Sequence, residues 1–323
     1  MDGANVKIIK LGNQGLNVPV VGLGCMGMSD FYGESDTRSN LNVLNYAAEI
    51  GCTFWDTADI YGPFHNEELL AKALAGKRDS ITLATKFGIK RNVEGDWLGL
   101  NGHPNYVKAS CEASLKRLNT DYIDLYYQHR IDPAVPIEDT VGAMAELVQE
   151  GKVKYIGLSE ADTETLERAH KVHPISALQT EYSLWSRDVE KSVLASTRKL
   201  EIGFVAYSPL GRGFLSGAIS SQEDLQAGDW RLENPRFKQE AIEHNAILVT
   251  KISKIAKDKN VTAAQISLAW LLAQGQDIAV IPGTRQLGYL EQNWQAATIK
   301  FSKDELKTLS KLSNDHSVWG SRY

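Results

Sequence analysis

Four polar side chains in this chain are of the types that transfer protons: a tyrosine, a lysine, an aspartate and a histidine. Asp56 and Tyr61 stand in the segment WDTADIYG, Lys86 in LATKFG and His129 in LYYQHR. A phenol with an ordinary pKa of about 10 is a poor acid at neutral pH, and a neighbouring ammonium group lowers that pKa because it favours the phenolate. We expect Asp56 to keep Lys86 charged and oriented, and His129 to orient a carbonyl oxygen or share its proton. Together the four residues predict a site that donates a proton.

These residues would meet if they stood at the ends of neighbouring strands in a parallel sheet. Segments rich in Val, Ile, Tyr and Phe and bounded by Gly, Asp or Pro predict strands at 20–24, 53–59, 81–87, 122–129, 153–159, 177–183, 203–209 and 277–283. Between them, apolar residues recur at helical spacing, most clearly in 66–76, 107–119, 140–151 and 189–200. Strands alternating with crossover helices predict a (β/α)8 TIM barrel of the α/β class, in which active sites lie at the carboxyl ends of the strands.

The remaining segments add detail to this barrel. Residues 7–20 predict a hairpin before the first barrel strand, and residues 303–315 predict an extra helix after the last. Longer loops are expected at 88–103 and 210–238. No linker, low-complexity segment or block of charge divides the sequence, so we expect a single domain over residues 1–323.

One glycine motif suggests a different fold. GLGCMG at 22–27 satisfies the pattern of a Rossmann dinucleotide-binding turn. Such a turn should open a helix at once and be followed by an acidic residue about 20 positions later. Here residues 28–36 intervene before any helical pattern begins. The motif is better explained as loop glycines after the first barrel strand.

Composition limits the functional classes. The 323 residues are 43% hydrophobic, as in chains that bury a core, and the 35 basic and 40 acidic residues are not clustered. Neither nucleic acid nor a membrane is therefore expected as a partner. No apolar run approaches the roughly 20 residues needed to span a bilayer, and the first ten residues lack a signal-peptide core. Three unpatterned cysteines suit a reducing compartment. We expect a cytoplasmic monomer or weak homo-oligomer without a bound metal.

Two loops have the features of a phosphate-binding site. Barrels commonly bind phosphates at the loops after the seventh and eighth strands, through backbone N–H groups and a helix N-terminus. SPLGRG at 208–213 follows the seventh predicted strand, and Gly211 and Gly213 would let its backbone approach a pyrophosphate. PGTR at 282–285 follows the eighth strand and opens a helix, where the cation of Arg285 opposes the helix dipole and favours an anionic partner. An ordinary glycine-rich loop and a solvated arginine are the alternatives.

Motifs along nearly the whole chain resemble those of the aldo-keto reductase superfamily and follow its order: DTADIYG, TKFG, YIDLYYQHR, GLSE, QTEYSLWSR, AYSPLGRGFL, and IPGTR followed by EQN. GLGCMGMS, HRID and GLSE are similar to a subgroup that includes perakine-reductase-like and auxin-induced-type proteins and many bacterial and fungal oxidoreductases. The resemblance implies a (β/α)8 barrel enzyme that uses NADPH/NADP+ to reduce a small-molecule aldehyde or ketone to the alcohol. It makes Tyr61 the general acid, with Asp56, Lys86 and His129 in support.

The same resemblance assigns the cofactor-binding residues. It implies that the nicotinamide stacks on Tyr207 and that Ser159 and Gln179 bind its carboxamide. Residues that would surround the pyrophosphate, the 2′-phosphate and the adenine are Ser208, Pro209, Leu210, Gly211, Gly213, Gly283, Thr284, Arg285, Gln292 and Asn293. Glu160 departs from the asparagine usual in the wider superfamily but fits the subgroup. Its carboxylate is expected either to interact with a helix dipole or to lie beside the nicotinamide and favour NADP+.

The sequence does not specify the substrate beyond a small carbonyl compound. Met26, Trp97, Trp230 and Trp319 are candidates for an apolar pocket, or equally for the rim of the barrel. Residues 316–323 form a short tail, which is expected to leave the pocket open to bulky carbonyls.

Two other functions fit part of the pattern. Lys86 could form a Schiff base in a barrel aldolase, where a depressed lysine pKa is needed, but Tyr61 and both phosphate loops would then lack a role. The chain could instead be a redox-sensing, NADPH-binding regulatory subunit, as the potassium-channel β-subunits with this barrel are. No partner-binding extension is visible in the sequence, which disfavours this interpretation.

Overall fold

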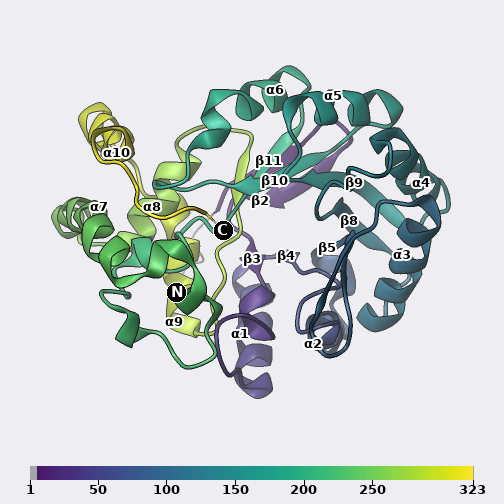
Figure 1. Ribbon diagram of the computed structural model, residues 1–323, viewed down its shortest axis with the longest axis horizontal. Helices are drawn as coiled ribbons and strands as arrows, with labels where there is room; N and C mark the ends of the chain where they lie inside the picture. The colour runs from purple at the N-terminus through teal and green to yellow at the C-terminus, as the bar shows by residue number, and fades with distance from the viewer. Residues whose placement is uncertain (1–5, 323) are drawn as a thin grey trace.

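Eight parallel strands curve into a barrel in the computed structural model, which describes residues 6–322 (Figure 1). They are β3 (Leu23–Gly24), β4 (Phe54–Asp56), β5 (Thr82–Phe87), β8 (Ile123–Gln128), β9 (Val153–Ser159), β10 (Ala177–Glu181), β11 (Gly203–Tyr207) and β12 (Ile278–Val280). Each strand pairs with the one before it, and the seam between the first and last is closed by parallel bridges from Val21 to Val280 and from Gly24 to Gly283. The predicted (β/α)8 barrel is confirmed.

Helices surround this sheet. Those of the barrel are α1 (Thr37–Ile50), α2 (His65–Leu74), α3 (Pro104–Leu118), α4 (Ile137–Gln149), α5 (Thr163–Val172), α6 (Val193–Lys199), α8 (Ala263–Leu272) and α9 (Leu287–Gln295). Their ends follow local capping rules: Asp36 accepts a hydrogen bond from Ser39 N at the start of α1, and Asn119 ends α3 in the left-handed conformation. Two further helices, α7 (Gln239–Asp258) and α10 (Lys303–Asp315), pack together outside the ring (Figure 1).

The amino end of the barrel is covered by the predicted hairpin, β1 (Ile8–Leu11) and β2 (Leu16–Pro19). Leu11 is fully buried against the start of β11, where a Cβ on Gly203 would lie only 2.5 Å from the Leu11 side chain. Close packing of this hairpin therefore requires a glycine at position 203.

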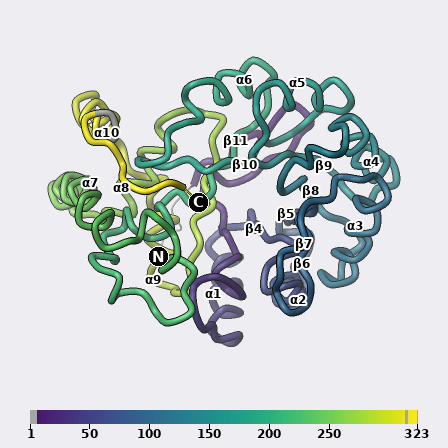
Figure 2. Tube along the Cα trace, in the orientation of Figure 1, coloured from purple at the N-terminus to yellow at the C-terminus, as the bar shows by residue number. Residues whose placement is uncertain are grey.

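Three local predictions need correction. The segment 88–103 is not a plain loop, because it contains the antiparallel pair β6 (Ile89–Arg91) and β7 (Trp97–Leu100) on the barrel rim (Figure 2). The expected helix 189–200 is interrupted at Ser192, between the 3-10 turn η3 (Asp188–Lys191) and α6. Helix α7 was not predicted.

The remaining short elements are 3-10 turns. They are η1 (Met26–Met28), η2 (Arg78–Ser80), η4 (Phe214–Ser216), η5 (Gln222–Asp224), η6 (Trp230–Glu233), η7 (Pro235–Phe237) and η8 (Ala296–Thr298). Four of them lie in the predicted loop 210–238, which is therefore ordered by local turns. The end of the GLGCMG motif forms the start of the 3-10 turn η1, and the first α-helix begins only at Thr37, so the motif is not a Rossmann turn.

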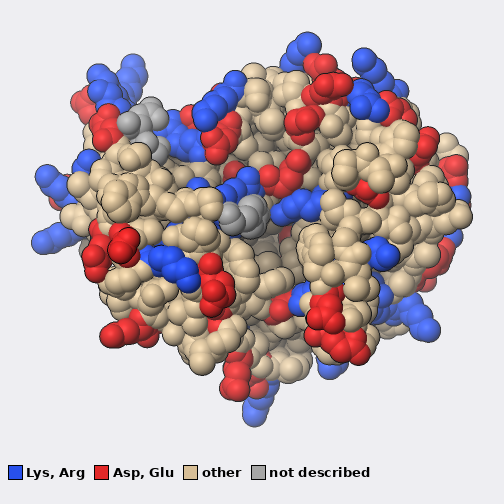
Figure 3. Space-filling model, viewed as in Figure 1, with Lys and Arg blue, Asp and Glu red and all other residues tan. Residues whose placement is uncertain are grey.

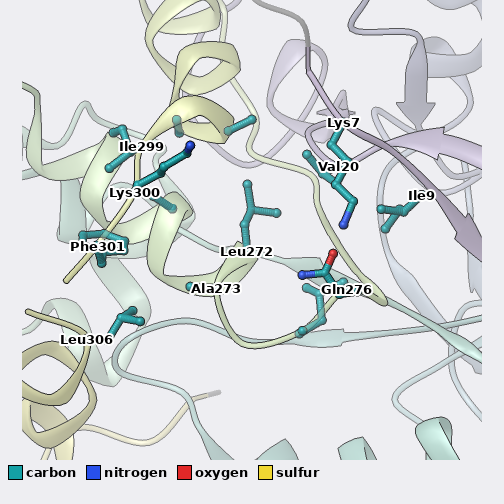
Figure 4. A pocket seen from close by; sticks show the side chains of 15 residues that line it. Lys7, Ile9, Val20, Leu272, Ala273, Gln276, Ile299, Lys300, Phe301 and Leu306 are labelled. Atoms are coloured by element: carbon teal, nitrogen blue, oxygen red, sulfur yellow. The ribbon is translucent and has the colours of Figure 1, made fainter. Parts of the chain in front are cut away.

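A cavity of about 400 Å³ lies at the amino end of β12, between the hairpin, the end of α8 and the segment that leads to α10 (Figure 4). Lys7, Leu272, Lys300 and Phe301 are among its lining residues. None of the described lining residues carries a carboxylate, imidazole or hydroxyl group. Lys7 and Lys300 are therefore its titratable groups among the described lining residues, and it lies at the opposite end of the barrel from the residues expected to do chemistry.

Candidate active site

The carboxyl ends of β4, β5 and β8 bring Asp56, Lys86 and His129 together. The Lys86 ammonium donates to the Asp56 carboxylate and, at 2.8 Å, to the carbonyl oxygen of Thr57. Lys86 is fully buried and Asp56 is 3% exposed. Two acceptors therefore fix Nζ inside the barrel mouth, and the lysine cannot turn out to solvent without leaving a buried carboxylate unpaired.

Tyr61 lies on the loop after β4, above this pair. The centroid of its ring is 5.2 Å from Lys86 Nζ and 5.8 Å from the centroid of the His129 ring, which meets it edge-on at 85°. Met26, Phe31 and Leu100 pack against the small apolar cluster that contains Tyr61. The four predicted residues thus share one site, and its immediate wall is apolar.

Residues that the sequence did not single out hold the Tyr61 loop in place. Asp30 forms an ion pair with Arg91 and accepts a hydrogen bond from Gly62 N at 3.0 Å. Arg91 also donates to the carbonyl oxygen of Ile60 at 2.9 Å. Asp30 and Arg91 lie 61 residues apart in the sequence, so no local pattern could have revealed this support.

Burial governs the electrostatics of the site. Burial lowers the pKa of Lys86, and the Asp56 carboxylate opposes that shift. Burial raises the pKa of Asp56, and Lys86 opposes the shift in turn. Burial, followed by the charges of Lys86 and Arg130, holds the pKa of His129 well below its ordinary value. This shift favours the neutral imidazole at neutral pH.

The residues expected at the carboxamide lie at the same face. Gln179 Nε2 donates to the second Asp56 oxygen at 2.7 Å, and Ser159 Oγ accepts a hydrogen bond from Arg130 Nη1 at 3.2 Å. Both residues are almost fully buried. Arg130, which the sequence analysis did not include, also donates to its neighbouring carbonyl oxygen at His129 at 2.7 Å.

The loop after β11 adopts a left-handed conformation at Ser208, Gly211 and Gly213, with φ of 46°, 56° and 97°. A Cβ on Gly211 would lie 2.5 Å from the indole of Trp185. Close packing against Trp185 thus explains the glycine at 211, where the sequence alone had suggested close approach of the backbone to a phosphate. Pro209 and Leu210 complete the turn, with Gly211 N donating to Ser208 O at 2.9 Å.

The loop after β12 leads into α9. Among residues 6–322, no side chain caps the N-terminus of this helix at Gln286, so the N–H groups of its first turn can bind an anion. Thr284 Oγ1 accepts from Gln286 N at 3.1 Å, while Arg285 donates to the carbonyl oxygens of Glu34 and Tyr32 at 2.5 and 3.1 Å. Arg285 therefore connects the Gly283 loop to the loop before α1.

Two more residues expected to contact the cofactor lie on α9. Asn293 is 3% exposed, and Gln292 is half-buried. An uncapped helix, an arginine and a left-handed glycine loop at adjacent strand ends have the chemistry to bind a phosphate-bearing dinucleotide. The residues present therefore fit such a cofactor.

The C-terminal tail runs from α10 back to the centre of the carboxyl face, where a hollow is bordered by both basic and acidic side chains (Figures 1 and 3). A mouth open to bulky carbonyls stays a prediction. Arg322 donates to Glu181 at 2.9 Å and forms an ion pair with Glu160. Trp319 stacks on His244 of α7, with ring centroids 4.0 Å apart, and so does not line the site.

Of the other two candidate tryptophans, one is exposed and one is half-buried. Trp97, on β7, is 60% exposed. Trp230 begins η6, and the Arg212 guanidinium carbon lies 5.4 Å from its ring centroid. Of the four apolar candidates, Met26 is the one that packs against the cluster around Tyr61 within residues 6–322.

Fold and site together define a (β/α)8-barrel protein in which a tyrosine, a lysine, an aspartate and a histidine lie together at the carboxyl ends of the strands. The aldo/keto reductase family model matches residues 20–314. The chain is 46% identical to the aldo-keto reductase yakc [NADP(+)] of Schizosaccharomyces pombe over 97% of this chain and 93% of that protein. It is 45% identical to probable aldo-keto reductase 1 of Glycine max over 100% and 93%. The chain belongs to the aldo/keto reductase family of oxidoreductases.

Solved structures agree with this assignment. A thermostable aldo-keto reductase solved with the inhibitor epalrestat is 32% identical, with a TM-score of 0.76 over 95% of this chain and 99% of that one. A glycerol dehydrogenase from Gluconobacter oxydans has a TM-score of 0.88 over 97% of both chains, and its 24% identity supports the fold alone. Within residues 6–322, no helix combines the length and apolar character needed to cross a membrane.

Proposed function

We propose that this enzyme reduces a small aldehyde or ketone to the alcohol with NADPH, and that Tyr61 donates the proton to the carbonyl oxygen. The observation that carries the proposal is the convergence of Tyr61, Lys86 and His129 at one point in the barrel mouth. Membership of the family and the NADP(+) in the name of the yeast relative support the choice of cofactor. When bound, NADPH supplies the hydride.

Each residue has a defined part in the proton transfer. The Lys86 ammonium, fixed by Asp56, lies beside the Tyr61 ring and favours the phenolate that remains after the proton leaves. His129 is neutral and can hydrogen-bond the carbonyl oxygen without competing as an acid. The apolar side chains of Met26 and Phe31 near Tyr61 favour a carbonyl with an apolar substituent.

The site offers less support for an aldolase. An imine would require Lys86 Nζ to reach the substrate, but this group is fully buried and donates to Asp56 and Thr57. A regulatory subunit remains distinguishable from an enzyme because it would bind NADPH without steady turnover of an added aldehyde.

The test is Tyr61→Phe, assayed by NADPH oxidation with a panel of carbonyl substrates. General acid catalysis contributes roughly 100- to 10,000-fold, so turnover should fall at least about 100-fold while NADPH affinity is kept. Tyr122→Phe is the matched control, because the Tyr122 hydroxyl bonds Asp79 at 2.9 Å at the amino end of the barrel, and it should leave turnover unchanged. Near-normal turnover of Tyr61→Phe would remove Tyr61 from the mechanism.

We also infer a single domain over 1–323, membership of the subgroup named above, and a cytoplasmic monomer or weak homo-oligomer. All three cysteines, Cys25, Cys52 and Cys111, are free and buried, which suits a reducing compartment. Sedimentation at micromolar concentration tests the oligomeric state, and a stable dimer would contradict it.

A further inference from the structure

The C-terminal tail is fixed to the barrel rim along its length. Trp319 exchanges two hydrogen bonds with the side chain of Asn245 on α7, at 3.0 and 3.1 Å. Further on, Arg236 Nε donates to Gly320 O at 3.3 Å, and Asn234 Nδ2 donates to Arg322 O at 3.1 Å. These bonds run from α7 to the loop before it, so the tail follows one path to the mouth of the barrel.

At the end of this path, the guanidinium of Arg322 contacts residues from the ends of three consecutive strands. It forms an ion pair with Glu160, directly after β9. It donates at 2.9 Å to Glu181, the last residue of β10, and at 2.6 Å to the hydroxyl of Tyr207, the last residue of β11. One side chain from the tail thus joins the ends of β9, β10 and β11, and the nicotinamide is expected at this part of the rim.

The charges of this cluster are nearly balanced. Glu181 is fully buried and also accepts hydrogen bonds from Arg212 at 3.0 Å and Arg236 at 3.4 Å. The Glu160 carboxylate accepts a hydrogen bond from Glu181 N at 3.0 Å and pairs with Arg322. Arg212 and Arg236 therefore pair with Glu181, whereas Arg322 pairs with both Glu181 and Glu160.

We propose that Arg322 sets the relative affinity of the enzyme for NADP+ and NADPH by neutralising Glu160. The proposal rests on the proposed function and on the family resemblance, which implies that the nicotinamide stacks on Tyr207. The ring is cationic in NADP+ and neutral in NADPH, so an uncompensated carboxylate beside it favours NADP+ alone. The Arg322–Glu160 pair cancels that preference and assists release of the oxidised product after each reduction.

The test is a comparison of NADP+ and NADPH dissociation constants, measured by fluorescence titration. Arg322→Gln leaves Glu160 without this guanidinium and should raise the affinity for NADP+ relative to NADPH by about fivefold, because solvent and salt screening at the barrel mouth reduce the interaction of one charge with the ring. Glu160→Gln leaves the guanidinium in excess and should lower the same ratio by about as much. The double variant, Glu160→Gln with Arg322→Gln, should return the ratio close to that of the unaltered enzyme.

Two controls separate charge from structure. Arg322→Lys keeps the positive charge and should keep the ratio. Arg198→Gln removes one positive charge from an exposed ion pair with Asp277 at the amino end of β12, and should leave the ratio unchanged. If both cofactors weaken equally in Arg322→Gln, the side chain only positions Tyr207 and the proposal is wrong.

The outcomes also separate this proposal from the proposed function. Should Arg322→Gln not fold, Glu160→Gln still decides, because an unchanged ratio in that variant overturns the role of the pair. A protein that binds both cofactors but reduces no carbonyl would contradict the proposed function. Its NADP+ and NADPH dissociation constants could still be compared, so the role of Arg322 would still be tested. An unaltered chain that binds neither cofactor would overturn both.

Discussion

His129 occupies a place in which a charged imidazole would be poorly stabilised. It is 7% exposed, its Nδ1 has no hydrogen-bond partner among residues 6–322, and Lys86 and Arg130 add positive charge nearby. These causes hold its pKa well below the value of about 6.5 expected in the unfolded chain. Below about pH 6.5 the unfolded chain therefore binds more protons than the folded one, and stability falls as the pH falls.

We predict that His129→Gln removes this part of the pH dependence. The unaltered enzyme should lose up to about 1.4 kcal/mol of unfolding free energy per pH unit below about pH 6.5 from this group, and the variant should not. Urea unfolding at several pH values measures the difference in slope. His65→Gln, at an exposed histidine that begins α2, is the control and should keep the slope of the unaltered enzyme. If the unfolding free energy of His129→Gln depends on pH as steeply as that of the unaltered enzyme, the prediction is wrong, because the imidazole then becomes charged in the folded state as well.

Which residues could be predicted from the sequence depends on how far away their partners lie. Asp56, Lys86 and His129 were identifiable because each ends an apolar segment, and parallel strands bring such ends together. The role of Arg322 could not be predicted, because Glu160 lies 162 residues away and the connection depends on the path of the tail. Arg130 follows His129 directly, yet its bond to Ser159 is visible only when β8 and β9 lie side by side.

At the scale of elements, the loop 282–286 and helix α9 form the proposed site for the 2′-phosphate. We predict that Arg285→Ala weakens NADPH by about 10- to 150-fold, because a hydrogen bond to a charged group contributes roughly 1.5–3 kcal/mol. NADH, which lacks the 2′-phosphate, should be almost unaffected, and fluorescence titration with both cofactors measures the difference.

The contacts of Arg285 in the structure give the alternative outcome of that experiment. Its guanidinium already donates to the carbonyl oxygens of Glu34 and Tyr32. If the side chain only connects these two loops, Arg285→Ala will weaken NADPH and NADH to the same extent. An equal loss for both cofactors would therefore contradict recognition of the 2′-phosphate.

Elements with a clear period were the most predictable. Residues 153–159 and 303–315 form the expected strand and helix with the expected bounds. The hairpin β6–β7 was missed because its short strands alternate weakly and its register depends on a turn in which Gly95 N donates to Asn92 O at 3.0 Å. The break at Ser192 was missed because the apolar spacing of 189–200 continues through it, while its backbone, with φ of −153°, does not.

At the scale of the whole molecule, the barrel is closed by few contacts. The first strand was predicted over 20–24, but the ladder includes only Leu23 and Gly24, and closure depends on the two bridges to Val280 and Gly283. The sequence pattern does not show how short the paired part of this strand is, because residues 20–24 are apolar or glycine throughout. A strand that passes this close to β12 has little room for a side chain at position 24.

We therefore predict that Gly24→Ala destabilises the whole barrel. Its Cβ would lie 2.7 Å from the carbonyl oxygen of Ile281, a backbone atom that cannot move without opening the seam. Forced overpacking of this kind costs about 1–3 kcal/mol, which should lower the midpoint of thermal unfolding by several degrees.

Gly142→Ala is the matched control, because it lies inside α4 with nothing within 4 Å of the added carbon. Alanine there should stabilise the protein by about 0.5–1 kcal/mol, so the two substitutions should shift the midpoint in opposite directions. A rise or no change for Gly24→Ala would show that the barrel tolerates a wider seam than these contacts allow.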